Sequence, residues 1–335
     1  MKLFRNIFFP LVPLYYLATW TRNKLYDLGI KKSKSYDLPV ICVGNLSVGG
    51  TGKTPMIEYM ISLLYESNIV ATLSRGYKRK TSGFQIANEN SSVGTVGDEP
   101  FQFYNKFKEK IIVSVDSDRQ NGIEKLQLNN DLLDVILLDD AFQHRKVKAG
   151  FNILLTTYAN LYVNDYLLPT GNLREPKSGA KRADIIVVTK CPTTLTDTEK
   201  GIIISQLKPK SNQHVFFSSI KYANQVINDN KKLELEKIVK FILVTGIANS
   251  KPLEDYLHSK NLNFKHLSFK DHHDFTKKEI ASFSEENLII TTEKDFMRLR
   301  QYDSLKPKLY YLPIETQIEN AMEFNTLIKN FVSKN

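Results

Sequence analysis

A glycine-rich segment at Gly44–Pro55, with the sequence GNLSVGGTGKTP, contains the residues best suited to chemistry. An apolar run at 39–43 precedes it and predicts a buried strand, and apolar residues at helical spacing follow it at 56–65. Glycines allow successive backbone N–H groups, together with the N-terminus of the following helix, to point at one anion. The segment therefore predicts a site for the phosphates of a nucleoside triphosphate.

The loop residues of this site differ in what they would supply. Lys53 would place a positive charge beside the β- and γ-phosphates, and the Thr54 hydroxyl suits Mg²⁺. Ser47 stands where the P-loop pattern has its first glycine, so a glycine-rich turn without a ligand is the alternative. The order strand, Gly-Lys-Thr, helix favours the nucleotide site. The residues expected to contact the nucleotide are Ser47, Val48, Gly49, Gly50, Thr51, Gly52, Lys53 and Thr54.

Carboxylates occur at three further places where they could serve phosphate chemistry. Asp139 and Asp140 end an apolar run, which is where a P-loop protein places its Mg²⁺ ligands. Asp98, in a predicted loop, could accept the proton of an attacking hydroxyl. Asp271 and His272 could form a pair that tunes such a base across a cleft between domains. For each group the alternative is a solvated acidic turn.

Basic residues follow several predicted strands, among them Arg75, Arg119 and Arg174. Arginines near a phosphoryl-transfer site commonly bind phosphate or offset the charge of the transition state. A solvated surface position is the alternative for each one, so their number matters more than any single residue.

The order of the predicted elements indicates an α/β protein with two domains. A chain of 335 residues exceeds the usual size of one core, and strands alternate with helices over 35–220, which predicts a P-loop domain with a doubly wound, mainly parallel sheet. Two short alternating strands at 221–237 indicate a β-hairpin linker, and a second α/β run at 238–335 predicts a smaller domain. We expect a cleft between the domains in which Asp98 and His272 meet.

Charge and cysteine content limit the partners of the chain. The formal net charge of +10 suggests an acidic partner, such as an anionic membrane or a phosphorylated substrate. No helix-turn-helix, zinc-finger or aromatic RNA-binding pattern occurs, so no nucleic acid is expected, and no obligate protein partner is evident. Cys42 and Cys191 each lie at the end of an apolar run, which is typical of a reduced, cytosolic chain without a disulfide or a zinc site.

Residues 1–34 form a basic, apolar N-terminal segment, with an apolar run at 7–18 followed by Trp20. The run is shorter than the roughly 20 residues of a membrane-spanning helix, and Pro10 and Pro13 interrupt it. Aromatic and leucine side chains with basic flanks favour a segment that lies at the surface of an anionic bilayer. The alternative is an amphipathic helix packed on the protein's own core.

Together these motifs resemble the tetraacyldisaccharide 4′-kinase family of lipid A biosynthesis. Lys78 and Asn172 depart from the family pattern, as does Ala141, but none of them replaces a proposed catalytic group. The matches occur in family order, which makes the resemblance specific. The matching segments are Val43–Pro55, Leu73–Tyr77, Val96–Pro100, Leu138–Arg145, Leu167–Pro176, Arg182–Lys190, Asp271–His272 and Thr292–Asp295.

The resemblance implies transfer of the γ-phosphate of ATP to the 4′-hydroxyl of a tetraacylated glucosamine disaccharide 1-phosphate. The product would be lipid IVA, made by a peripheral enzyme at the cytoplasmic face of the inner membrane with ATP and Mg²⁺ as cofactors. Lys53 and Asp98 would be catalytic, with Asp98 as the base and Asp271 and His272 in support. Thr54, Asp139 and Asp140 would serve Mg²⁺. The residues implied to line the substrate and phosphate cleft are Arg75, Arg119, Gln143, His144, Arg174 and Glu175.

Two other classes of protein fit part of the sequence. Val187–Lys190 resembles the start of the guanine-reading Thr-Lys-x-Asp motif of P-loop GTPases, but the fourth position is Pro192 rather than aspartate. A non-catalytic membrane adaptor with a vestigial nucleotide site is the other class, and the intact Lys53 and Thr54 argue against it.

Overall fold

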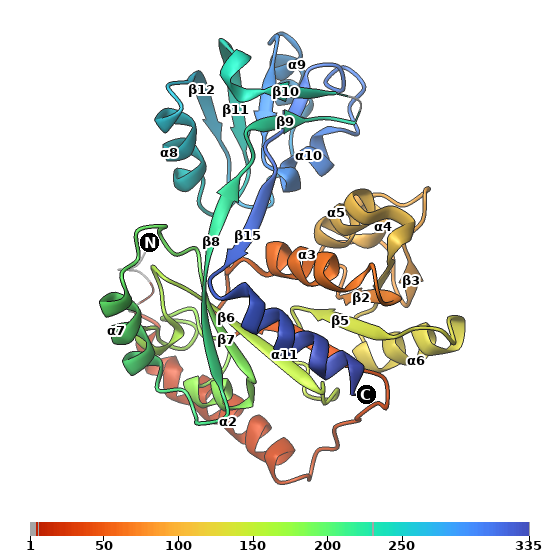
Figure 1. Cartoon of the computed structure of the whole chain (residues 1–335), viewed down its shortest axis with the longest axis vertical. Helices are drawn as coiled ribbons and strands as arrows, with labels where there is room; N and C mark the ends of the chain where they lie inside the picture. Colours follow the sequence, from red (N-terminus) through yellow and green to blue (C-terminus); the bar gives the residue numbers. More distant parts are fainter. Residues whose placement is uncertain (1–4, 6, 230, 335) are drawn as a thin grey trace.

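Apolar runs that end in glycine, serine, threonine or aspartate form the central strands of a nine-stranded sheet in the larger of two domains (Figure 1). The computed structural model describes residues 5, 7–229 and 231–334. The inner strands are parallel, and an antiparallel strand lies at each edge. In spatial order the strands are β15 (Ile314–Ile318), β8 (His214–Tyr222), β7 (Ile185–Thr189), β6 (Phe151–Thr157), β1 (Val40–Asn45), β5 (Val135–Asp139), β2 (Val70–Ser74), β4 (Ile112–Val115) and β3 (Gln85–Ile86).

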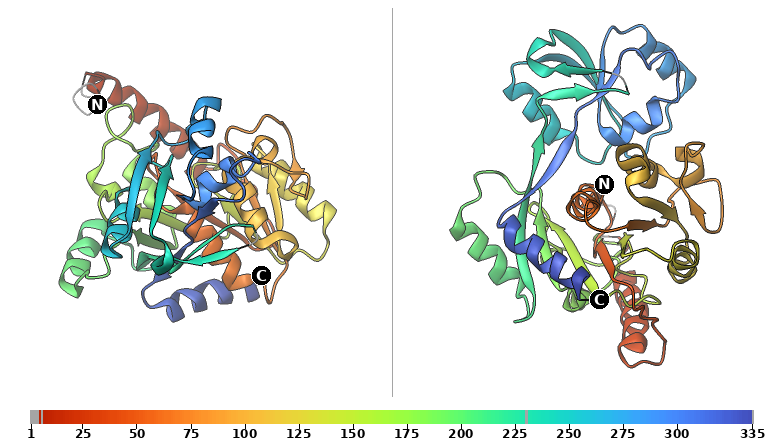
Figure 2. Two further views of the ribbon diagram at one scale, coloured as in Figure 1. Left: turned by 90° about the horizontal axis from the view of Figure 1, so that it is seen from above. Right: turned by 45° about the vertical axis from the view of Figure 1, so that its right-hand side comes forward.

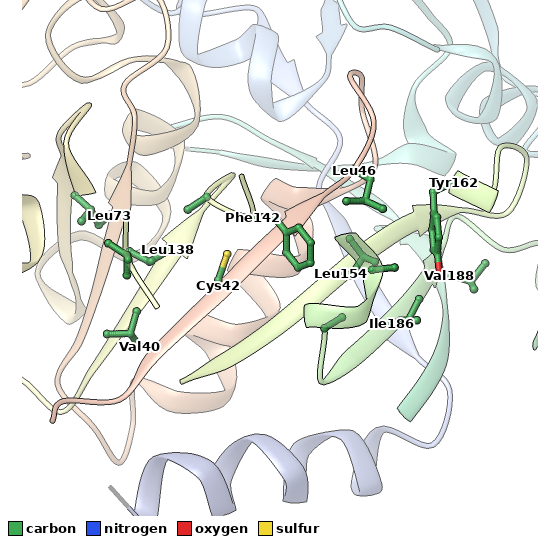
Figure 3. Packing of buried hydrophobic residues seen from close by; sticks show 14 of the residues in the cluster. Val40, Cys42, Leu46, Leu73, Leu138, Phe142, Leu154, Tyr162, Ile186 and Val188 are labelled. Carbon is green, nitrogen blue, oxygen red and sulfur yellow. The ribbon is translucent and has the colours of Figure 1, made fainter. Parts of the chain in front are cut away.

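Alternate residues of the inner strands enter two hydrophobic cores on opposite faces of this sheet. Val40 and Cys42 of β1 belong to the core drawn in Figure 3, and Ile41 and Val43 belong to the other. Helices cover both faces, as the predicted doubly wound sheet requires. The first core takes residues from α2 (Val12–Asp27), α6 (Arg119–Asn129) and α7 (Asp197–Leu207), and the second from α3 (Lys53–Leu64), α4 (Val93–Val96), α5 (Asp98–Phe107) and α11 (Ala321–Ser333).

The smaller domain has its own six-stranded sheet and two hydrophobic cores. Its three α-helices are α8 (Lys251–Ser259), α9 (Lys277–Ser284) and α10 (Glu293–Leu299), among the described residues. In spatial order its strands are β10 (Lys232–Glu234), β9 (Gln225–Ile227), β14 (Leu309–Tyr311), β13 (Ile289–Thr291), β11 (Lys240–Thr245) and β12 (Asn263–Ser268). The 3₁₀ helices of the chain are η1 (Phe9–Leu11), η2 (Lys108–Lys110), η3 (Tyr162–Asn164), η4 (Lys177–Arg182) and η5 (Leu235–Lys237).

The junction between the domains differs from the expected linker at 221–237. The predicted hairpin forms as β9 and β10, but it is the edge of the small sheet. The domains are joined instead by the long strands β8 and β15, which pair antiparallel (Figure 1). The chain then returns to the large domain, where Phe324 and Ile328 of α11 are fully buried. The small domain is therefore an insertion between β8 and β15, because the apolar face of α11 packs against the second core.

Helix α2 is attached to the large domain along one side and exposes apolar residues on the other. Val12 and Tyr15 pack against the first core, whereas Leu14, Leu17 and Trp20 are 65%, 57% and 42% exposed. Seen from above, the N-terminal part of this helix projects beyond the rest of the chain (left panel of Figure 2). One side of the helix thus packs on the protein's own core, which was the alternative considered for residues 1–34, and the location of the exposed apolar side at a bilayer surface stays a prediction.

No helix within the described part of the chain has the length and apolar character needed to cross a bilayer.

Candidate active site

A cavity of about 1470 Å³ lies where the carboxyl ends of the central strands of the large domain face the small domain. β1 and β5 are parallel neighbours with Val43 opposite Asp139, so the glycine-rich loop and the acid pair leave the sheet at the same edge. Ile247–Asn249 and Thr292–Lys294 of the small domain line the other side. The expected cleft between the domains is therefore present.

The glycine-rich loop has the backbone shape of a phosphate-binding turn. Gly49 and Gly52 have φ angles of 112° and 86°, which side chains rarely adopt, and Gly52 directly precedes α3. Two neighbours fix the loop: Asn45 Nδ2 donates to Thr51 Oγ1 at 2.7 Å, and Thr189 Oγ1 donates to the Thr51 carbonyl at 2.8 Å. The loop N–H groups and the N-terminus of α3 are thus arranged for an anion.

Seven of the eight expected nucleotide residues, 48–54, line the cavity. Ser47 does not: it forms an isolated antiparallel bridge with Leu173. The bridge holds Ser47 against the segment at 172–173, and the chain reaches the cavity from Val48 onward.

Two basic groups hold Asp140 at the cavity wall. Lys53 Nζ lies 3.7 Å from Asp140 Oδ1, and Arg174 Nη1 lies 3.0 and 3.1 Å from its two carboxylate oxygens. Asp140 adopts a φ of 47°, a conformation that is uncommon for residues other than glycine and that often occurs at functional sites. The Asp140 carboxylate therefore lies beside any ligand that binds to Lys53.

Asp139 is almost completely buried, and two other carboxylates lie near enough to affect its pKa. Burial, followed by the nearby Asp140 and Glu99, raises the pKa of Asp139 to about 7. A divalent cation beside Asp139, Asp140 and the Thr54 hydroxyl would offset this repulsion, and Mg²⁺ typically takes one or two carboxylates plus phosphate oxygens. The residues present therefore fit Mg²⁺, although the described residues contain no cluster of three or more His, Cys, Asp or Glu side chains that could hold a metal alone.

Asp98 and His272 meet across the domain boundary, as expected. His272 Nδ1 lies 2.9 Å from Asp98 Oδ2. Arg298, which the sequence did not indicate, also binds both Asp98 oxygens, with Nε 3.0 Å from Oδ1 and Nη2 at Oδ2. Although burial opposes it, hydrogen bonds from His272 and Arg298 lower the pKa of Asp98 to about 2. Asp98 is therefore an ionised carboxylate that both partners orient.

Asp98 itself is 5% exposed and does not line the cavity, whereas His272 does. Lys294 Nζ lies 2.9 Å from His272 Nε2 and 3.4 Å from Asp271 Oδ1. An ammonium group only donates, so Nε2 carries a lone pair on this side. His272 has a φ of 58°, another strained backbone position at the cavity wall.

The expected substrate residues divide into two groups. Arg75, Arg119, Gln143, His144 and Arg174 line the cavity, but Glu175 does not.

Glu175 lies behind the cavity wall, where it is 3% exposed. It accepts hydrogen bonds from Gln143 at 2.9 Å, Arg182 at 2.8 Å and Asn23 at 2.7 Å. Its neighbour Arg174 points to the cavity, and successive residues of an extended segment face opposite sides. Glu175 therefore orients Gln143 and ties α2 to the site.

Three residues that sequence reasoning missed lie beside the expected ones. Arg298 and Lys294 flank His272, and Glu99 lines the cavity next to Asp98. Lys294 belongs to Thr292–Asp295, a segment that matches the family pattern. This match was the only indication in the sequence that α10 approaches the cavity. Nothing in the sequence connects Arg298 with Asp98, because 200 residues separate them.

Comparisons with known proteins indicate the same family over nearly the whole chain. The family model for tetraacyldisaccharide-1-P 4′-kinases matches residues 4–333. A protein of Flavobacterium johnsoniae named tetraacyldisaccharide 4′-kinase is 50% identical over 100% of this chain and 99% of its own length, and one of Bacteroides fragilis with the same name is 43% identical over 98% and 93%.

The crystal structure of the "apo" form of LpxK from Aquifex aeolicus in complex with ATP superimposes with a TM-score of 0.77 and 31% identity. The superposition covers 98% of this chain and 99% of that one. Fold and sequence thus agree over both domains, and the chain belongs to the tetraacyldisaccharide-1-P 4′-kinase family.

Proposed function

We propose that this chain is a lipid kinase that transfers the γ-phosphate of ATP to the 4′-hydroxyl of tetraacyldisaccharide 1-phosphate and forms lipid IVA. The observation that carries the proposal is one cavity lined both by the P-loop and by His272, in a chain whose full-length relatives are named for this activity. ATP is the expected donor because the solved relative from Aquifex aeolicus is a complex with ATP.

The glycine-rich loop and Lys53 would hold the β- and γ-phosphates at the N-terminus of α3. Mg²⁺, held by Thr54, Asp139 and Asp140, would neutralise charge on the phosphate oxygens. Lys53 Nζ lies 3.7 Å from Asp140 Oδ1, so the lysine and the residues that would hold Mg²⁺ border the same part of the cavity. This assigns the loop and the acid pair to binding and to stabilisation of the transition state.

Asp98 and His272 would act as one proton-accepting pair. The 4′-hydroxyl oxygen attacks the γ-phosphorus, the bond from phosphorus to the ADP oxygen breaks, and the hydroxyl proton passes to the pair. In this structure His272 lines the cavity, whereas Asp98 does not and binds His272 Nδ1. Nε2 accepts a hydrogen bond from Lys294, so Lys294 would have to release Nε2 before this nitrogen could take the hydroxyl proton. The arrangement supports transfer through the imidazole rather than directly to Asp98.

The remaining cavity residues suit a substrate with a phosphorylated sugar head. Arg75 and Arg174 offer guanidinium groups for phosphate, and Gln143 and His144 offer polar groups for sugar hydroxyls. Tyr15, Thr19 and Arg22 of α2 line the same cavity, so the helix with the exposed apolar side borders the substrate site. An acylated substrate could thus reach the site while its chains stay near α2.

We also propose that α2 holds the enzyme peripherally at the inner membrane's cytoplasmic face. Leu14→Glu together with Leu17→Glu should lower the amount bound to vesicles containing anionic phospholipid by about tenfold or more, because burying each leucine contributes roughly 1.5–3 kcal/mol. Flotation with the vesicles measures binding. Leu128→Glu, which changes a leucine of α6 that is 76% exposed, is the matched control and should float like the wild type. Equal flotation of the α2 variant would contradict this arrangement.

The activity is tested by incubating the purified chain with ³²P-labelled ATP, Mg²⁺ and tetraacyldisaccharide 1-phosphate in detergent micelles. Thin-layer chromatography should show a labelled lipid that has gained one phosphate, and chelation of Mg²⁺ with EDTA should abolish it. The same lipid lacking the 4′-hydroxyl should remain unlabelled. Folded protein that binds ATP but never labels the lipid would overturn the proposed function.

A further inference from the structure

Helices α5 and α10 lie side by side and join the two domains next to the site (Figure 1). Each carries a charged contact at both ends. At one end Asp98, the first residue of α5, binds Arg298 in the last turn of α10. At the other end Lys106, in the last turn of α5, lies 3.4 Å from Glu293, the first residue of α10. These contacts align the helices in opposite directions and fix their register.

Lys106 is also bound to a third helix. Its Nζ lies 2.7 Å from Glu58 Oε2 of α3, and Gln102 Nε2 donates to the other Glu58 oxygen at 2.7 Å. Lys53, at the start of α3, precedes Glu58 by little more than one turn. Lys106 therefore connects α3, which begins at the nucleotide loop, with α10, whose side chains contact Asp98 and His272.

The bridge consists of one cation between two carboxylates that are each 5% exposed, Glu58 and Glu293. Although burial opposes it, the charges of these two groups raise the pKa of Lys106, so the lysine stays protonated. Burial and the neighbouring Glu58 raise the pKa of Glu293 to about 7 even with Lys106 present. Without the cation Glu293 would therefore be protonated, and α10 would lose the charged contact that ties it to Glu58 of α3. The position of α10 relative to α3 thus depends on Lys106.

We propose that Lys106 is a positioning residue for phosphate transfer: by binding Glu58 and Glu293 together, it sets the distance between the nucleotide loop and the Asp98–His272 pair. This inference rests on the proposed kinase function. Lys106 does not line the cavity, so it acts through α3 and α10 rather than on the substrate. A displacement of about 1 Å between reacting groups can cost roughly 100-fold in rate.

The test measures kcat and the KM for ATP by the labelled-lipid assay in Lys106→Met and Lys106→Arg. The methionine variant should lose about 10- to 100-fold in kcat with the KM for ATP within about threefold of wild type, since the loop itself is intact. Arginine keeps the charge and should restore most of kcat. Lys125→Met, which removes an exposed lysine of α6, is the matched control and should behave as wild type.

The triple variant Glu58→Gln, Lys106→Met and Glu293→Gln distinguishes a positioning role of Lys106 in catalysis from a role in stability alone. It leaves no unpaired buried charge, so its Tm should recover toward wild type while kcat stays low. Full kcat in Lys106→Met, or recovery of kcat together with Tm in the triple variant, would overturn the inference. If Lys106→Met does not fold, the triple variant and Lys106→Arg still decide the matter. Wild-type protein that labels no lipid would refute the kinase function instead.

Discussion

Lys53→Ala is expected to lower the rate of phosphate transfer by about 10³-fold or more. Lys53 is the first residue of α3, and its Nζ lies beside Asp140 at the cavity wall. Without it, no side-chain cation of the loop would remain to offset the charge that develops on the transferring phosphoryl group. The measurement is kcat/KM for ATP in the labelled-lipid assay.

The control for this prediction is Lys125→Ala, which removes one positive charge from the exposed side of α6 and should keep full activity. A melting curve checks that Lys53→Ala is folded, and we expect little change in Tm because Lys53 pairs only at 3.7 Å with Asp140. Transfer within tenfold of wild type would show that the γ-phosphate lies elsewhere.

Asp98→Asn should lower kcat by about 10²- to 10⁴-fold, because the amide no longer offers the imidazole an ionised partner. It should also reduce the free energy of unfolding by about 3–5 kcal/mol, since Arg298 would keep a buried charge without its partner. His272→Asn should cause a similar loss of kcat with a smaller loss of stability. The measurements are kcat and urea denaturation.

A matched exchange, Asp303→Asn, removes a carboxylate that is 90% exposed and should change neither quantity appreciably. The double variant of Asp98 and His272 should be no slower than the slower single variant, because groups that act as a unit show strongly non-additive effects. Losses that multiply in the double variant would mean that the two residues act independently.

Local patterns were sufficient to predict most of the secondary structure. β1, β5 and β7 are apolar runs whose strand character depends on the run itself and on the glycine or polar residue that follows. The glycine-rich loop was equally predictable, because its shape follows from Gly49 and Gly52. These features need no knowledge of distant contacts.

Features that depend on tertiary packing could not be predicted in the same way. The hairpin of β9 and β10 has the sequence of a free linker, and only its pairing with β14 places it in the small sheet. Glu175 has the charge of a cavity residue, but its three hydrogen bonds hold it behind the wall. Arg298 has an ordinary helical context, so its role beside Asp98 appears only when the domains are assembled.

The insertion of the small domain between β8 and β15 also determines how the chain can fold during synthesis. Translation delivers the P-loop and its strands first, then the whole small domain, and only afterwards residues 314–333. Until these residues leave the ribosome, the face of the large sheet that α11 covers stays open and Tyr59 lacks its ring contact with Phe324. The small domain can fold earlier as a unit. The second core of the large domain can therefore be completed only after the small domain has been synthesised.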